Sequence, residues 1–432
     1  MGKMHSDLEK QIDYDKESEI DEIGNSGGLF GSVKKVIKTA LTHIGPGWMI
    51  AVGYLDPGNW ATDIEAGSKF GYQHLFIILI STTMALLLQY LCIRLANRTG
   101  LDLATACRIK TPKYLNYLLY ILAEVSIIAC DLSEVIGTAI ALKLLLGLNL
   151  KIGIILTILD VFILLCFWND KRSLFLERLI IFMTLMVGGC FFIQIAMIKP
   201  NTIDILRGCL PSLSFFEKLN DSGFLVATLG ILGATVMPHN LYLHTFLALQ
   251  QDSIKWCCID ALLALVFAML INGSILIVAS ETSRQKIDEV GIEQIANALS
   301  NWQGTFAGFL FVIALLAAGQ SSTLCGTMAG QIIFEGHLQF ETRKWTRKLL
   351  TRSLSIVPSI CIFWIFGDSY VGKLLIWSQI VLSFQLPFAM IPLLLFSTQD
   401  IKFYSPLYIV SWVVVSVVII LNMALICITF IN

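Results

Sequence analysis

Two helix-breaking tetrads lie inside long apolar stretches of the chain. The first, Asp-Pro-Gly-Asn, occupies residues 56–59, and the second, Met-Pro-His-Asn, occupies residues 237–240. Proline lacks an amide hydrogen, so backbone carbonyls at both places lose helical partners that lipid cannot replace. A carboxylate at the centre of a membrane helix adds a cost of about 2.5–3.5 kcal/mol on insertion scales. Unwound backbone at that depth is tolerated only where protein or a water-filled cavity surrounds it.

The composition indicates a polytopic membrane protein. Of 432 residues, 56% are hydrophobic and only 14% are charged, which is more apolar surface than a soluble domain of this size needs. The net charge of −1 argues against nucleic-acid binding. The 11 cysteines lie mostly in apolar runs without a C-x-x-C pair, so they are interpreted as small hydrophobic residues and not as a zinc site or disulfide framework.

The N-terminal segment is polar and acidic, which distinguishes it from the rest of the chain. It cannot bury enough apolar surface to fold, and it lacks the apolar core of a cleavable signal peptide. We therefore expect a disordered cytosolic tail over residues 1–40 and a transmembrane domain over residues 41–432.

A spanning helix needs about 20 apolar residues, and eleven segments meet that requirement. They are 43–66, 74–96, 115–146, 151–168, 177–199, 223–250, 258–280, 302–328, 349–366, 371–396 and 405–431. Lysine and arginine gather in alternate connections, at 34–38, 94–113, 171–178 and 343–352. This bias predicts a cytosolic N-terminus and, with an odd number of spans, places Asn432 outside.

The interrupted spans are the first and the sixth, which are five spans apart. This period predicts one repeat over about 43–199, a second over about 223–396, and an additional helix at about 405–431. An odd number of helices in each repeat inserts the second copy upside down, so the two interruptions meet near the bilayer midplane. A pair of such interruptions is the best indication in a sequence of a transporter binding site.

The tetrads offer a mixed set of metal donors. Asp56 supplies an anionic oxygen, Asn59 a neutral oxygen and Met237 a thioether sulfur, and unwinding frees carbonyls near Ala234, one turn before Met237. This set suits Mn²⁺ or Fe²⁺, because Ca²⁺ and Mg²⁺ favour shells made only of oxygen. A single carboxylate also leaves the ion free to depart. The competing interpretation is a kinked helix with a snorkelled acid and a core methionine.

The two tetrads, in this order and at this separation, resemble those of the NRAMP family of proton-coupled divalent metal transporters. The similarity runs from about residue 40 to 400. The segment 319–336 (GQSSTLCGTMAGQIIFEG) resembles that family's consensus loop after the eighth helix, and the segment 378–388 (SQIVLSFQLPF) fits its tenth helix. The resemblance implies an all-α inverted five-helix repeat of the leucine-transporter type, with helices 1 and 6 broken. The metal contacts that it implies are Asp56, Asn59, the Ala234 carbonyl and Met237, with Gln379 as a further polar contact.

Three residues depart from the family pattern. Cys325 stands where threonine is common, and Phe334 and His337 replace the more usual methionine and aromatic residue. We expect them in the loop after helix 8, where they bear on gating and not on the metal site. Relatives that carry magnesium or aluminium typically lack the methionine of the second tetrad, whereas this chain keeps Met237.

The third predicted span carries three acids on one helical face, since Glu124, Asp131 and Glu134 are spaced by seven and three residues. Acids in a membrane helix mark a water-lined path or a proton relay by default. The alternative is a buried ion network that merely joins the third and ninth helices.

Three further residues complete the predicted proton pathway. Arg352, early in the ninth span, is the natural countercharge, and His239 titrates nearest neutral pH. The resemblance agrees, because the family passes protons through acids on the third helix toward an arginine on the ninth. Asp56 then acts both as a metal ligand and as the first proton acceptor.

The leading hypothesis is a proton-coupled importer (a symporter) of Mn²⁺ and Fe²⁺ in a bacterial inner membrane. It needs no cofactor and no protein partner, only metal ions, protons and the bilayer. A Mg²⁺ carrier is disfavoured by the methionine, and a Na⁺-coupled amino-acid transporter would need glycine-rich unwound backbone for a substrate carboxylate. A receptor on a transporter body would be expected to carry a large soluble extension. An enzyme is not expected, because no nucleophile–base pair or nucleotide loop is visible.

Overall fold

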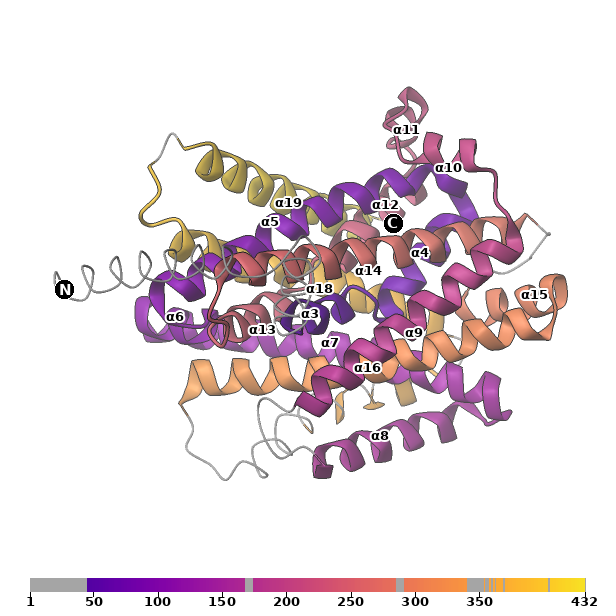
Figure 1. The fold of residues 1–432 in the computed structure, drawn as a ribbon, viewed down its shortest axis with the longest axis horizontal. Coiled ribbons are helices and arrows are strands. Elements are labelled where there is room, and N and C mark those ends of the chain that lie inside the picture. The colour runs from indigo at the N-terminus through magenta and orange to yellow at the C-terminus, as the bar shows by residue number, and fades with distance from the viewer. Residues whose placement is uncertain are drawn as a thin grey trace, which may run out of the picture. The chain divides into compact units, whose positions relative to one another are not determined.

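The structure is a computed structural model. It describes residues 45–167, 174–284, 291–339, 353, 357–358, 360–361, 363–367, 370–402 and 405–431. Every regular element within these ranges is a helix, as the sequence predicted (Figure 1). The predicted tail, half of the predicted ninth span and Arg352 lie outside the described residues.

Most of the long helices begin and end within a few residues of the predicted spans. The exception is the helix of the predicted span 302–328, which extends to Leu338. The long helices are α5 (Leu75–Thr99), α7 (Lys113–Leu146), α8 (Leu150–Phe167), α9 (Leu174–Ile198), α14 (Ile254–Ser283), α16 (Thr305–Leu338), α18 (Val371–Ser397) and α19 (Pro406–Ile431). The sequence analysis did not anticipate the short helices between them. They are η1 (Gly71–His74), α6 (Leu103–Lys110), α10 (Thr202–Gly208), α11 (Leu213–Lys218) and α15 (Ile292–Gln303).

Two predicted spans each contain a pair of shorter helices. The first contains α3 (Pro46–Gly53) and α4 (Pro57–Phe70), and the sixth contains α12 (Ser222–Thr235) and α13 (Pro238–Ala248). Helix α3 packs against α13, and α4 packs against α12. In Figure 1, α3 and α13 accordingly lie on one side of the interruptions, and α4 and α12 on the other.

Eight segments of the described chain are long and apolar enough to cross a membrane, judged by length and composition. One reason for the difference from eleven is that α4 and α5 follow each other closely and count as one segment, Pro57–Thr99. Large apolar side chains are also exposed on the outer helices, including Ile155 on α8, Phe182 on α9 and Ile420 on α19. Apolar surface of this kind favours lipid over water, so the protein is a multi-pass membrane protein.

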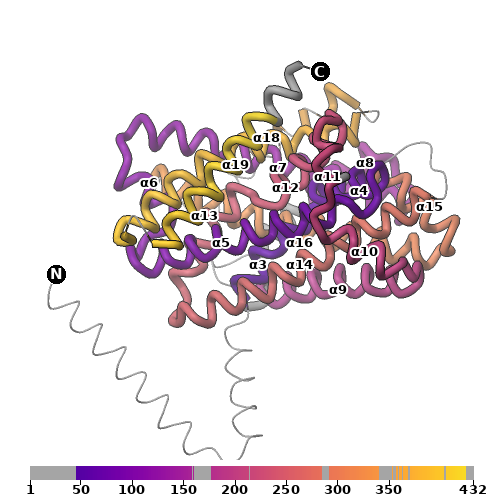
Figure 2. The backbone as a smooth tube through the Cα atoms, turned by 90° about the horizontal axis from the view of Figure 1, so that it is seen from above, coloured from indigo at the N-terminus to yellow at the C-terminus, as the bar shows by residue number. Residues whose placement is uncertain are grey.

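Helix α7 packs against α16, α18, α8 and α4, whereas α14 packs against α3, α4, α5 and α9. The last helix, α19, lies along α18 at the outside of this arrangement, where it is drawn in yellow in Figure 2. The interrupted helices are thereby enclosed by protein and not by lipid, which is the condition for unwound backbone at membrane depth.

The prediction of a loop at 319–336 is wrong, because this segment is helical and belongs to α16. Its small residues let α16 approach α7 closely instead of ending the helix. A Cβ atom on Gly319 would overlap the Thr138 hydroxyl of α7, and one on Gly326 would lie 3.2 Å from Glu134 Oε1. The glycines that suggested a loop are therefore contact points between two helices.

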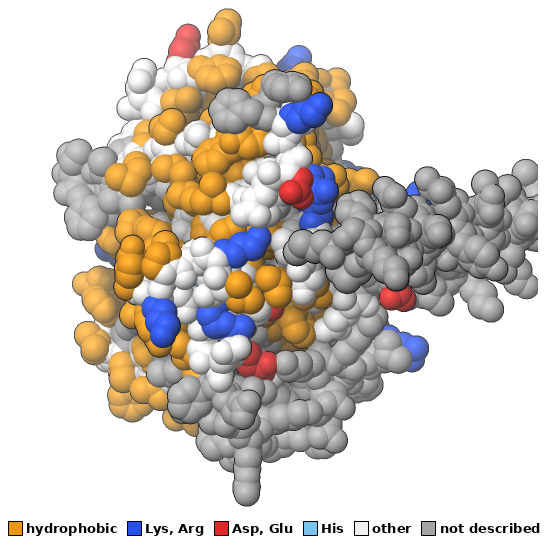
Figure 3. All heavy atoms as spheres, turned by 90° about the vertical axis from the view of Figure 1, so that its left-hand side faces the viewer, with side chains coloured by type: hydrophobic (Ala, Val, Ile, Leu, Met, Phe, Trp, Pro, Cys, Tyr) orange, Lys and Arg blue, Asp and Glu red, His pale blue; other side chains and the backbone are white. Residues whose placement is uncertain are grey.

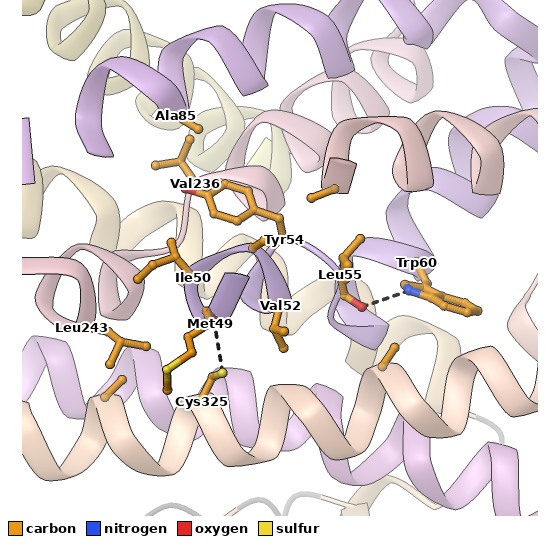
Figure 4. Packing of buried hydrophobic residues seen from close by; sticks show 14 of the residues in the cluster. Met49, Ile50, Val52, Tyr54, Leu55, Trp60, Ala85, Val236, Leu243 and Cys325 are labelled. Atoms are coloured by element: carbon orange, nitrogen blue, oxygen red, sulfur yellow. Dashed lines mark hydrogen bonds between the residues drawn. The ribbon is translucent and has the colours of Figure 1, made fainter. Parts of the chain in front are cut away.

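The three departures from the family pattern consequently lie in a helix. Cys325 Sγ donates a hydrogen bond to the Met49 carbonyl of α3 over 3.2 Å (Figure 4). His337 Nδ1 lies 2.6 Å from Asn116 Oδ1 of α7, and Phe334 is buried. These side chains therefore affect how α16 packs against α3 and α7.

Helix α3 is held at both ends by α14. At its start, Asp260 Oδ2 accepts hydrogen bonds from the backbone amides of Gly47 at 2.6 Å and Gly45 at 3.3 Å. The first amides of a helix lack partners within it, and a carboxylate also complements the helix dipole there. Just beyond its last residue, the Tyr54 carbonyl accepts from Asn272 Nδ2 at 2.8 Å. These contacts position α3 against the site at its C-terminal end.

Candidate metal and proton sites

The first interruption leaves the Gly53 carbonyl without a helical donor. Pro57 follows Gly53 by four residues, and its ring nitrogen has no hydrogen to give to the Gly53 oxygen. Asn59 Nδ2 donates to that oxygen instead, over 3.2 Å. Asp56 caps α4, because its Oδ1 accepts from Asn59 N at 2.9 Å and from Asn59 Nδ2 at 2.6 Å. One aspartate and one asparagine therefore stabilise the open backbone.

The second interruption follows the same rule. Pro238 comes four residues after Ala234, so no backbone amide can donate to the Ala234 carbonyl in the helical pattern. Val236 is extended, with φ −107° and ψ 103°, and Met237 is the N-cap of α13 without a side-chain capping bond. This interruption therefore combines a carbonyl that lacks a helical donor with a fully buried thioether.

Helix α7 brings the two interruptions together. Ser133 Oγ donates to Asp56 Oδ2 over 3.1 Å. Cys130, one turn earlier on α7, packs in one cluster with Met237. The carboxylate of the first tetrad therefore contacts α7, and Met237 of the second packs in a cluster with the preceding turn of the same helix.

Helix α18 also packs against residues of both interruptions. A Cβ atom on Gly58 would overlap Gln379 Nε2 and would lie 3.1 Å from Asp56 Oδ2, so the amide of Gln379 rests on the first tetrad. Leu382, one turn further along α18, packs in the cluster of Met237. Gln379 is fully buried, and its Oε1 has no hydrogen-bond partner among the described residues. A buried, unpaired oxygen of this kind favours an ion or a water molecule beside it.

The five residues predicted to contact metal are all buried, and Asp56, Asn59 and Gln379 are adjacent. Their exposed fractions are 0% for Asp56, 2% for Asn59 and 0% for Ala234, Met237 and Gln379. Within the described ranges, no three His, Cys, Asp or Glu side chains are grouped as a metal site would require. An ion bound here would rely on one carboxylate with amide, carbonyl and thioether donors, a set that suits borderline metals.

The residues of the predicted proton pathway lie on the side of the predicted metal contacts that faces α7. Glu134 Oε1 accepts a hydrogen bond from Ser322 Oγ of α16 at 2.5 Å and from Cys130 Sγ at 3.4 Å. The same sulfur lies 3.7 Å from His239 Nε2. Glu134 and His239 are therefore connected through the thiol of Cys130.

Asp131 and Glu124 extend this line of acids along α7. Asp131 is fully buried, and a Cβ atom on Gly326 of α16 would lie 3.8 Å from its Oδ1. Glu124 is seven residues earlier, about 10 Å along the helix axis. Its Oε1 is buried without a hydrogen-bond partner in the described part of the chain. Asp131 and Glu134 share the α7–α16 interface, whereas Glu124 lies apart from them.

Three residues that connect these groups were not predicted from the sequence, namely Ser133, Cys130 and Ser322. A signal existed for Ser133, which lies between two buried acids in a span, and for Cys130, which directly precedes the first of them. Ser322 could not be found from spacing, because only the packing of α16 on α7 brings it to Glu134.

Comparisons with known proteins show which family the chain resembles. A family model described as natural resistance-associated macrophage protein-like matches residues 47–428. The divalent metal cation transporter MntH of Mesorhizobium japonicum is 44% identical over 403 residues, covering 88% of this chain and 87% of the relative. MntH of a Nostoc species is 44% identical over 402 residues, covering 88% and 90%.

Solved structures are similar as well. A manganese transporter of Eremococcus coleocola, in complex with an aromatic bis-isothiourea substituted compound, has a TM-score of 0.80 and 32% identity. The match covers 90% of this chain and 87% of that structure. Mhp1, a nucleobase-cation-symport-1 family transporter, has a TM-score of 0.56 at 13% identity, which shows a likeness of fold alone.

Gly58 tests whether the amide of Gln379 belongs to this site. Gly58→Ala must push that amide away from Asp56, so we expect Mn²⁺ binding about tenfold weaker, the effect of one lost polar contact worth about 1.4 kcal/mol. Calorimetric titration of the purified protein measures it. Gly189→Ala on α9 is the control, since a Cβ atom there meets no atom of the described residues within 4 Å. Equal affinity in the two variants would remove Gln379 from the site.

Proposed function

The chain belongs to the natural resistance-associated macrophage protein family, and on that premise we propose that it imports Mn²⁺ and related divalent transition-metal ions together with protons. It is a transporter and not an enzyme. The observation that supports the proposal is that α7 contacts Asp56 through Ser133 and shares a buried cluster with Met237, so residues carrying a hard anion and a soft sulfur pack around one helix. The MntH relatives are named divalent metal cation transporters, and the structure of similar fold is a manganese transporter.

The metal ion, as the transported substrate, is held by Asp56, Asn59, the Ala234 carbonyl, Met237 and Gln379. The single carboxylate supplies charge against the desolvation of the ion, and the neutral oxygens complete its shell. The sulfur favours Mn²⁺ and Fe²⁺ over Ca²⁺ and Mg²⁺, which prefer oxygen. Because only one ligand is charged, the ion can also leave.

Protons take a separate path along α7. Asp56 is the first acceptor, and Ser133 connects its carboxylate to the helix that carries Asp131 and Glu134. His239 reaches the same helix through Cys130. Glu124 extends the path along α7, and Arg352 is its expected countercharge.

Two inverted repeats of five helices support alternating access. We assign them to about 43–199 and 223–396, with α19 as an eleventh helix. The pairs Gly53–Pro57 and Ala234–Pro238 are equivalent breaks in the two halves, as such a repeat requires.

The orientation places the N-terminus in the cytosol and the C-terminus outside, in a bacterial inner membrane. Figure 3 views the end of the bundle on the side of α6 and α13, where blue basic side chains are more abundant than red acidic ones. Arg98 there pairs with Asp400 at 2.7 Å, and Arg108 donates to the Gly336 carbonyl at 2.7 Å. Basic residues concentrate on the cytosolic side of membrane proteins, which supports this assignment.

Removal of the single anionic ligand tests the transport proposal. Asp56→Asn should reduce Mn²⁺ uptake into proteoliposomes to the level of empty vesicles, because an amide cannot offset the desolvation of a divalent ion. Exposed Asp252 provides the control, and Asp252→Asn should transport as the wild type does. Strong Mn²⁺ uptake by Asp56→Asn would overturn the metal site.

The proton path makes a different prediction. Asp131→Asn leaves the metal contacts in place, so it should bind Mn²⁺ by calorimetry within about threefold of the wild type. It should nevertheless lose the acidification of the vesicle interior that accompanies Mn²⁺ entry, recorded with a trapped pH dye. If acidification linked to metal entry persisted in full, Asp131 would be part of a structural ion network instead.

A further inference from the structure

Asn240, the last residue of the second tetrad, has a buried side-chain amide. The side chain is fully buried, and neither Nδ2 nor Oδ1 has a hydrogen-bond partner among the described residues. Burying an unpaired amide is unfavourable, and a leucine of similar size would fill the same space without that cost. An unpaired amide at such a position favours a polar ligand that binds there transiently.

The amide lies against the end of α3. A Cβ atom on Gly53 would overlap Asn240 Nδ2 and would lie 2.6 Å from Oδ1, so glycine at this position makes room for the amide. The Gly53 carbonyl in turn accepts a hydrogen bond from Asn59 Nδ2 at 3.2 Å. Asn240 is therefore next to the residue that holds Asn59.

The position of Asn240 relative to the site is fixed by the two interruptions. Asn240 follows Met237 by three residues, which is one turn into α13, and Gly53 is the last residue of α3. Helices α3 and α13 pack together on the side of the site away from α4 and α12. This is the cytosolic side in the orientation proposed above.

We propose that Asn240 Oδ1 is the first ligand to receive the metal ion when it leaves Asp56 and Met237 for the cytosol. The inference rests on the proposed function and adds a release step to it. A neutral amide oxygen is a suitable ligand for this step, because it replaces one lost contact without adding a charge that would retain the ion. Asn240 Oδ1 then offers the ion an oxygen beside Gly53, at the end of α3 that also contacts Asn59.

The test separates binding from release. Asn240→Leu in the full-length protein should bind Mn²⁺ by calorimetry within about threefold of the wild type, while the maximal rate of uptake into proteoliposomes falls about tenfold. Gly53→Ala should likewise lower the maximal rate of uptake more than the affinity for Mn²⁺. Its methyl group displaces the Asn240 amide without changing the chemistry of that amide.

Asn422→Leu is the matched control. Asn422 is also buried, but its Nδ2 donates to the Ser383 carbonyl at 2.7 Å, so its loss should affect stability without separating affinity from rate. The proposal is overturned if Asn240→Leu transports at the wild-type rate, or if its affinity and rate fall by the same factor. Mn²⁺ uptake by the wild type in the same vesicles tests the proposed transport function separately from the role of Asn240. Absence of wild-type uptake would refute the transport function itself.

Discussion

The structure depends on two carbonyls that lack a helical donor in an apolar interior. At Gly53 and at Ala234 the residue four positions later is proline, which cannot donate a hydrogen bond to the carbonyl. Lipid offers no substitute donor, so the surrounding protein must supply polar groups or a ligand. At Gly53 the chain supplies the amide of Asn59. At Ala234 we propose that the transported metal ion takes this role.

Close helix packing surrounds these breaks with protein. A Cβ atom on Gly137 of α7 would overlap the ring of Pro57, and a Cβ atom on Gly319 of α16 would overlap the hydroxyl of Thr138. Small residues at these contacts let α7 approach both the first interruption and α16. The same helix then carries Ser133 to Asp56, so packing and function depend on one element.

The sequence predicted the features that follow from local chemistry. Apolar length located most spans to within a few residues, and proline with glycine located both interruptions. The sequence did not predict the features that depend on contacts between helices. The glycines and serines of 319–336 resemble loop residues in isolation, yet Gly319, Ser322 and Gly326 face α7 from within α16. The proximity of Gln379 to Gly58, and of Cys130 to both Met237 and His239, also depends on packing between helices that are distant in sequence.

The coordination shell of bound Mn²⁺ tests the account most directly. X-ray absorption at the manganese edge, on the full-length protein loaded with one equivalent of Mn²⁺, distinguishes sulfur from oxygen neighbours. The account predicts one sulfur neighbour among oxygens, and its disappearance in Met237→Ala while the oxygen shell remains. A shell of oxygen and nitrogen alone, unchanged by Met237→Ala, would contradict it.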